Sequence, residues 1–119
     1  MKVSKRSKQV AETIQQQLMA GGMETVMSWG VSRWSVGELE DKRPFLALDV
    51  NGLLHQGETR IILEWSDTYT VQNLTEGQVV KEQSDVYCDE VTSVVDLFVE
   101  YPGSDEEYRA AIDKIFNYG

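Results

Sequence analysis

The fold is decided by residues 59–72, which read TRIILEWSDTYTVQ. Residues 59–65 are rich in β-branched side chains and predict a strand. Ser66-Asp67 is a typical turn pair, and residues 68–72 predict a returning strand. Because strands joined by so short a turn run antiparallel, this stretch predicts a β-hairpin within an antiparallel sheet.

Further strands are predicted on both sides of this hairpin. Residues 45–50 predict an earlier strand, and residues 78–81 predict a short last strand after a turn at 75–77. Residues 23–36 predict a strand that is broken or bulged near Gly30, because the alternation of apolar residues changes parity there. Together these segments predict a meander of four or five strands.

The turn after residues 45–50 has two candidates. Asn51-Gly52 is a strong signal for a two-residue hairpin, and residues 55–57 (His-Gln-Gly) offer a competing turn. We favour the second turn, with Asn51-Gly52 as a bulge, because Leu53-Leu54 extends the first strand.

An amphipathic helix is predicted over residues 4–20. Val10, Ile14 and Leu18 recur every four residues and form one apolar stripe. Gly21-Gly22 is expected to end this helix, since glycine adopts helix-terminating conformations at little cost.

Two helices are predicted near the C-terminus. Residues 86–100 place Val91, Val94, Val95 and Phe98 on one stripe, although the β-branched valines leave a strand as the alternative. A second helix is predicted over residues 105–117, because Ser104 and Glu107 have the spacing of a capping box.

The whole chain, residues 1–119, is thus expected to be one α+β domain. Its order is an N-terminal helix, the antiparallel meander, and two C-terminal helices that pack with the first on one face of the sheet. Residues 1–6 are expected to be a flexible basic tail, and residues 104–119 an appended capped helix.

Composition narrows the class of protein. The chain has 119 residues and 41% apolar residues, which suits one soluble domain with a core. Cys88 is the only cysteine, so a disulfide scaffold is excluded and a reducing compartment is favoured. No apolar run is long enough for a membrane helix or a secretory signal. We therefore expect a location in the cytoplasm and no membrane partner.

Charge is distributed unevenly along the chain. Residues 82–113 contain ten acidic residues and one basic residue, a local charge of −9 that equals the formal charge of the whole chain. Such a surface repels nucleic acid and attracts basic surfaces, so nucleic acid is not an expected partner. The candidate interaction face consists of Asp85, Asp89, Glu90, Asp96, Glu100, Asp105 and Glu106.

Three tryptophans are candidate aromatic contacts: Trp29, Trp34 and Trp65. Core packing is the simpler explanation for them, and stacking on bases is disfavoured because few basic residues lie nearby. If one of them is exposed, contact with a partner protein is the better interpretation.

Candidate chemical groups are few. His55 has no adjacent nucleophile and is expected to be a solvated turn residue. Cys88 is expected to be a small, half-buried residue. Asp85 with Asp89, and Asp96 with Glu100, lack the ligand count of a dedicated metal site. No catalytic residue, metal site or cofactor is therefore predicted, and these observations disfavour an enzyme.

Three segments resemble small uncharacterised proteins of bacteriophages and mobile elements. They are residues 8–18 (KQVAETIQQQL), residues 67–71 (DTYTV) and residues 86–91 (VYCDEV). The similarity covers roughly residues 7–99 in the same order. It implies a helix–sheet–helix order and a phage or mobile-element origin, and it brings no activity and no catalytic residue.

The function expected from these observations is a small non-enzymatic protein-binding or accessory protein, present in a bacterial host as a monomer or homodimer. The alternative is an acidic mimic of nucleic acid that inhibits a host DNA-binding protein or nuclease. Carboxylates lined along one face would favour the mimic, and scattered carboxylates would count against it.

Overall fold

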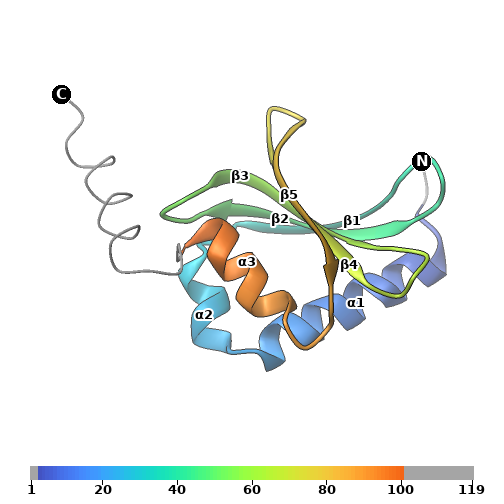
Figure 1. Ribbon diagram of the computed structural model, residues 1–119, viewed down its shortest axis with the longest axis horizontal. Helices are drawn as coiled ribbons and strands as arrows, with labels where there is room; N and C mark the ends of the chain where they lie inside the picture. The colour runs from blue at the N-terminus through green and yellow to red at the C-terminus, as the bar shows by residue number, and fades with distance from the viewer. Residues whose placement is uncertain (1–2, 101–119) are drawn as a thin grey trace.

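The computed structural model describes residues 3–100, which form an open five-stranded antiparallel sheet with helices packed on it (Figure 1). Each strand pairs with its neighbour in sequence, in the order β1-β2-β3-β4-β5, so the predicted α+β class and antiparallel meander are confirmed. The elements are α1 (Lys5–Ala20), α2 (Met23–Ser28), β1 (Arg33–Glu38), β2 (Pro44–Asn51), β3 (Gln56–Leu63), β4 (Tyr69–Thr75), β5 (Gln78–Val86) and α3 (Val91–Val99).

The hairpin predicted from residues 59–72 is the β3–β4 pair. Ile61 lies opposite Val71, and the strands are joined by a turn in which the Glu64 N–H donates to the Thr68 carbonyl at 2.9 Å. β3 ends at Leu63, so Trp65 lies in this turn, and the prediction that the strand extends to Trp65 is wrong.

The turn between β2 and β3 lies between the two sequence candidates. Asn51 pairs with Gln56, and the Gly52 N–H donates to the His55 carbonyl at 3.0 Å, so residues 52–55 form the loop. The favoured turn at residues 55–57 is therefore wrong, and Leu53-Leu54 does not extend the strand. The Leu54 N–H instead donates to a carbonyl of α3, which holds the loop away from the strand direction.

Residues 23–28 form helix α2, so the strand predicted over residues 23–36 is wrong in its first half. The buried residues there are Val26 and Trp29, three positions apart, which is a helical spacing. Met23 and Met27, the alternating apolar residues that suggested a strand, are 62% and 73% exposed. Gly22 has a φ of +136°, which lets the chain turn sharply between α1 and α2.

Helix α1 confirms the predicted N-terminal helix. Its buried stripe is Ala11, Ile14 and Leu18, and Ser4 caps it by accepting the Ser7 N–H. The flexible tail predicted over residues 1–6 is wrong for Lys5 and Arg6, because both lie in the first turn of the helix.

In the C-terminal half of the described chain, the boundaries of β5 and α3 differ from the predicted ones. β5 is longer than the predicted strand at 78–81, and α3 begins at Val91 rather than at residue 86. β5 has two register shifts, one that leaves Val80 as an extra residue and one near Asp85, where φ is 58°. The helix predicted over residues 104–119 lies outside the described residues.

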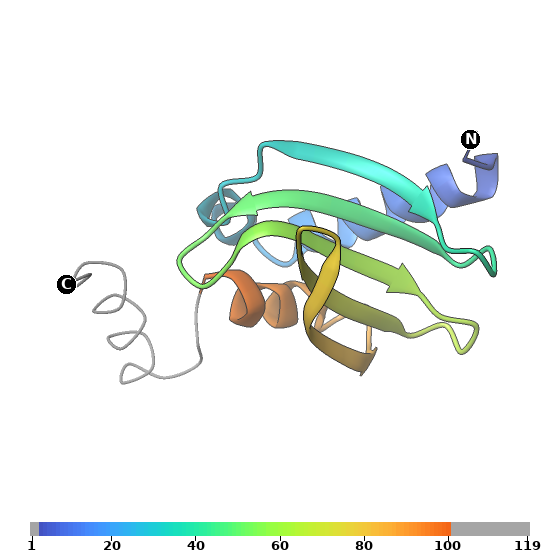
Figure 2. The same cartoon turned by 90° about the horizontal axis from the view of Figure 1, so that it is seen from above.

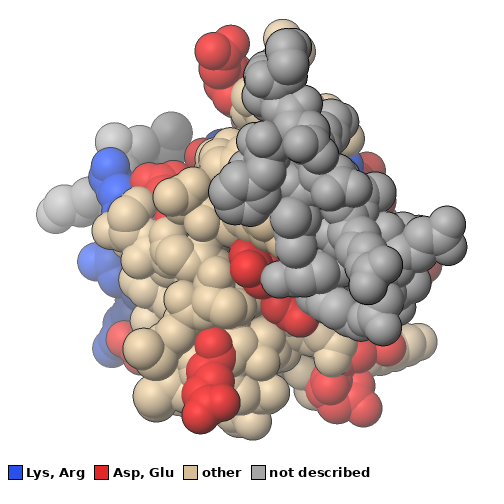
Figure 3. All heavy atoms as spheres, turned by 90° about the vertical axis from the view of Figure 1, so that its left-hand side faces the viewer, with Lys and Arg blue, Asp and Glu red and all other residues tan. Residues whose placement is uncertain are grey.

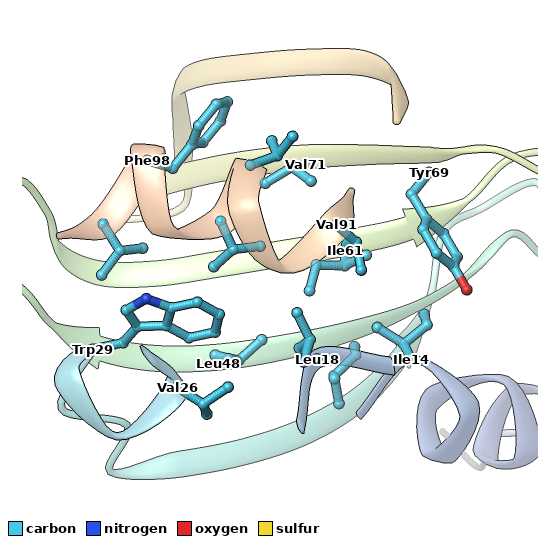
Figure 4. Packing of buried hydrophobic residues seen from close by; sticks show 14 of the residues in the cluster. Ile14, Leu18, Val26, Trp29, Leu48, Ile61, Tyr69, Val71, Val91 and Phe98 are labelled. Atoms are coloured by element: carbon cyan, nitrogen blue, oxygen red, sulfur yellow. The ribbon is translucent and has the colours of Figure 1, made fainter. Parts of the chain in front are cut away.

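The core lies between the sheet and the helices (Figure 4). Figure 2 shows α1 beneath β1 and β2, and α3 beneath β4. Each fully buried large side chain contributes roughly 1.5–3 kcal/mol to folding by leaving water. The largest buried side chains include Trp29, Ile14, Leu18, Leu48, Ile61 and Val71.

The helix ends are closed by contacts from other elements. The Thr92 hydroxyl donates to the Leu18 carbonyl at 3.1 Å, in the last turn of α1. The Asn73 amide donates to the Phe98 carbonyl at 3.0 Å, and the Leu54 N–H donates to the Val99 carbonyl at 2.7 Å. These bonds supply donors to carbonyls in the last turns of α1 and α3. The first joins α3 to α1, and the other two hold α3 against β4 and the β2–β3 loop.

Candidate functional site

An apolar groove of about 510 Å³ lies between α1 and the edge strand β1, and we call it the α1–β1 groove. The buried side chains of Ala11 and Leu46 contribute to its lining, together with the half-buried Trp34 and Val36. The other lining residues are Val3, Lys8, Glu12, Gln15 and Ser35. The groove thus combines an apolar surface with two charges of opposite sign.

One end of the groove is fixed by Glu38, the last residue of β1. Its Oε1 accepts the Ser4 N–H at 2.8 Å and the Ser7 hydroxyl at 2.7 Å, which ties the start of α1 to β1. Hydrogen bonding by Ser4, and next by Ser7, lowers the pKa of Glu38 from 4.5 to about 2. The carboxylate therefore acts as a charged clamp that sets the spacing of the two groove walls.

The other end of α1 is held by β4. The Tyr69 hydroxyl donates to Oε1 of Gln17 at 2.6 Å, and burial raises the pKa of Tyr69 above its ordinary value. Since α1 is attached near both of its ends, the groove is a fixed feature of the fold.

A second hollow, of about 580 Å³, lies between α3 and β5 and includes Lys81 in its lining. The Lys81 ammonium lies 4.6 Å from the centre of the Phe98 ring, a cation–π contact. Asn73 lies here with both ends of its amide used, because it also accepts the Thr59 hydroxyl at 2.8 Å. These polar groups are already paired within the protein, which leaves the hollow less suited to a ligand than the α1–β1 groove.

The sheet face away from the core carries its own polar network. Arg43 contacts Asp41 and Glu64, and Arg60 lies 4.6 Å from the centre of the Phe45 ring. Burial raises the pKa of Glu64, but hydrogen bonds from Thr70 and Arg43 outweigh it, so the net shift is downward. These charges are therefore engaged with one another.

The predicted acidic face is only partly free. Asp96 accepts the Trp29 indole N–H at 2.9 Å, Glu100 accepts the Leu53 N–H at 2.7 Å, and Glu90 accepts the Tyr87 N–H at 2.9 Å. Asp85 and Asp89 are exposed, and Asp105 and Glu106 lie outside the described residues. In the view of Figure 3, the acidic side chains that are drawn in red stand in separate places rather than in one line.

The three tryptophans have three different environments. Trp29 is fully buried in the core, as core packing required, and Trp34 lines the α1–β1 groove. Trp65 is 66% exposed at the β3–β4 turn. An exposed tryptophan favours contact with a partner protein over a purely internal role.

Two further predictions are wrong. His55 is 7% exposed rather than solvated, and its Nε2 lies 3.0 Å from the Glu58 carbonyl. Cys88 is exposed rather than half-buried. The sequence could not indicate either outcome, because both depend on how the loops fold back onto α3 and α1.

The described residues offer no cluster of metal ligands and no membrane-spanning helix. Within residues 3–100, no group of three His, Cys, Asp or Glu side chains is arranged to hold a metal ion. Asp85 and Asp89 do not share a helix face, because Asp85 is in β5 and α3 begins only at Val91. No helix in the described part of the chain has both the length and the apolar character to cross a membrane.

No protein-family model, curated protein or solved structure matches the chain. The α1–β1 groove is therefore the candidate site on the strength of its own geometry. Sequence reasoning missed it because its walls come from segments far apart in the chain. The only local signal was the Trp34–Val36 alternation, which places both side chains on one side of a strand.

Proposed function

We propose that this chain is a small non-enzymatic protein-binding or accessory protein, of phage or mobile-element origin, that holds a partner protein in the α1–β1 groove. The observation that supports this proposal is the apolar groove beside a sheet edge, with Trp34 in its wall. Concave apolar surfaces with a few polar groups at the rim are typical of binding sites. On this proposal the chain acts in the cytoplasm of a bacterial host.

The chemistry of the groove suits a polypeptide. Ala11 contributes a small side chain to the lining, while Trp34 offers a large apolar surface. Lys8 and Glu12 on the rim supply one positive and one negative charge, which favours a partner with ordered charges over a purely apolar one. Aromatic residues in such settings often dominate the binding energy.

The test is site-specific photo-crosslinking with the full chain in host cells. A photoreactive phenylalanine analogue replaces Gln15 at the groove, and in a matched control it replaces Glu76 in the β4–β5 turn, far from α1 (Figure 1). We expect a partner protein to be captured from position 15 and not from position 76. Equal capture from both positions contradicts a partner in the groove.

Two tryptophan variants sharpen this test. Trp34→Ala removes the groove wall, and Trp65→Ala removes an exposed tryptophan at the β3–β4 turn. We expect Trp34→Ala alone to reduce the captured amount, with thermal melting used to confirm that both variants fold. Loss of capture by Trp65→Ala instead would move the binding surface to the β3–β4 turn.

The acidic mimic is the weaker proposal. Asp96 and Glu100 are half-buried and accept N–H groups of the protein, and the exposed Glu90 accepts the Tyr87 N–H; Asp85 and Asp89 are the other exposed candidates among the described residues. The double variant Asp85→Asn, Asp89→Asn separates the two functions. It abolishes binding by a mimic that uses these carboxylates, and it leaves binding in the α1–β1 groove unchanged.

A further inference from the structure

The free edge of β1 presents unpaired main-chain groups beside the groove. β1 is the first strand of the sheet and pairs only with β2 among the described strands. The Leu39 N–H donates to the Arg43 carbonyl at 2.9 Å, so the odd-numbered residues along this ladder direct their main-chain groups toward β2. By the alternation of an antiparallel pair, Trp34 and Val36 direct theirs away from it.

The same two residues line the groove with their side chains. A strand placed beside β1 would therefore bond to the main chain of Trp34 and Val36. Its inward side chains would lie against the Trp34 and Val36 side chains, in the groove. Addition of a peptide strand at a sheet edge, with side-chain pockets alongside, is an established way for proteins to bind extended segments.

We propose that the α1–β1 groove binds an extended segment of a partner protein, which adds to the sheet as a strand next to β1. This inference rests on the proposed protein-binding function and specifies how the partner binds. The segment has apolar side chains at alternate positions, because only every second side chain of a strand faces the groove.

The other edge of the sheet is less suited to such an addition. β5 is interrupted by the extra residue at Val80 and by the register shift near Asp85. Lys81 and Glu82 place charges on the same strand. Bulges and charges are the features that discourage strand addition, whereas β1 pairs with β2 in an unbroken register from Arg33 to Glu38.

Charge complementarity specifies the segment further. Lys8 lines the groove, and Lys5 and Arg6 precede it in the first turn of α1. That first turn contains no acidic residue. None of these three cations takes part in an ion pair within the described residues. An acidic residue near one end of the segment, on the side of Lys8, is therefore expected.

The first experiment identifies what the full chain selects. Random 12-residue peptides displayed on phage are panned against the immobilised full chain. We expect enriched peptides with apolar residues at alternate positions, an acidic residue near one end, and no proline in the middle. Enrichment of apolar residues at helical spacing, or no enrichment, overturns the proposal.

The second experiment tests the main-chain bond. Val36→Pro removes the N–H at the free edge and leaves the bonds to β2 in place, since proline is tolerated on edge strands. Val36→Ala is the matched control, because it shortens the side chain and keeps the N–H. We expect Val36→Pro to raise the Kd of a selected peptide by about tenfold more than Val36→Ala does. Equal effects contradict strand addition.

A chemical variant of the peptide keeps the test valid if Val36→Pro does not fold. The selected peptide is N-methylated either on its odd-numbered amides or on its even-numbered amides. We expect only one of the two sets to weaken binding, because an added strand bonds to β1 through alternate residues. Equal weakening by both sets, or by neither, overturns the proposal.

These experiments distinguish a failure of strand addition from a failure of the groove as a binding site. If Trp34→Ala weakens peptide binding but Val36→Pro matches Val36→Ala, then the groove binds the peptide and strand addition is wrong. If neither Trp34→Ala nor Val36→Pro affects binding, the groove itself is wrong. If light scattering shows a dimer of the full chain that Val36→Pro dissociates, the occupant is a second copy, and the proposed partner segment is wrong.

Discussion

The indole N–H of Trp29 donates to Oδ1 of Asp96 at 2.9 Å, across 67 residues of sequence. Trp29 ends α2 and is fully buried, whereas Asp96 lies on α3 and is half-buried. This bond joins the short helix α2 to the last described helix. It also gives an acidic residue of the predicted interaction face a structural role, because the carboxylate satisfies a buried N–H.

Removal of this acceptor is expected to destabilise the fold. Asp96→Leu leaves the buried Trp29 N–H without a partner, which costs about 2 kcal/mol of unfolding free energy. Asp96→Asn keeps an oxygen acceptor and should cost clearly less. Urea denaturation measures both variants, with Asp89→Asn as an exposed control. Equal losses in Asp96→Leu and Asp89→Asn would contradict the role of the bond.

The Glu38 clamp predicts how stability depends on pH. Its folded pKa of about 2 lies below the ordinary 4.5, so the ionised carboxylate stabilises the fold above pH 4.5. That contribution is lost as the pH falls from 4.5 toward 2. We expect the Tm of the wild type to exceed that of Glu38→Gln at pH 7, and the difference to disappear near pH 2.

The matched control for this titration is Glu12→Gln, because Glu12 is exposed on the same helix. Its Tm should follow the wild-type curve across the whole pH range. A constant offset between wild type and Glu38→Gln, from pH 7 to pH 2, would show that Glu38 contributes by packing rather than by charge.

The close approach of the β2–β3 loop to α3 predicts that substitution of Gly52 destabilises the fold far more than substitution of Gly77. A Cβ at Gly52 would lie 2.4 Å from the Val99 carbonyl oxygen, so Gly52→Ala forces the loop away from α3 at a cost of about 1–3 kcal/mol. Gly77 has a φ of +80° and nothing within 4 Å, and asparagine tolerates that conformation.

Thermal melting of Gly52→Ala and Gly77→Asn compares the two positions. We expect a clear loss of Tm for the first variant and little change for the second. Similar melting temperatures in the two variants would mean that the loop does not need its close approach to α3.

The sequence predicted those elements whose patterns are local. Helix α1 followed from the spacing of Ile14 and Leu18, and the β3–β4 hairpin followed from β-branched residues around a short turn. Residues 23–28 were misassigned because Met23 and Met27 alternate with polar residues as in a strand, although they lie in the exposed part of a helix. The buried pair, Val26 and Trp29, gave the correct spacing but spans barely one turn.

The candidate site was harder to predict, because no single segment contains it. The sequence indicates Trp34 as an aromatic candidate, but its place in one groove lining with Ala11 depends on the packing of α1 against β1. The acidic residues were conspicuous in the sequence, yet Asp96 and Glu100 accept N–H groups of Trp29 and Leu53. Such long-range partners leave no pattern in the local sequence.

The register shifts of β5 also limit how many molecules can join through sheet edges. A sheet grows into a fibril only when each added molecule offers a fresh edge to the next. In this chain the edge opposite β1 carries the extra residue at Val80 and the distortion near Asp85. We therefore expect growth to stop after one addition at β1, which makes an open sheet compatible with a protein that does not polymerise.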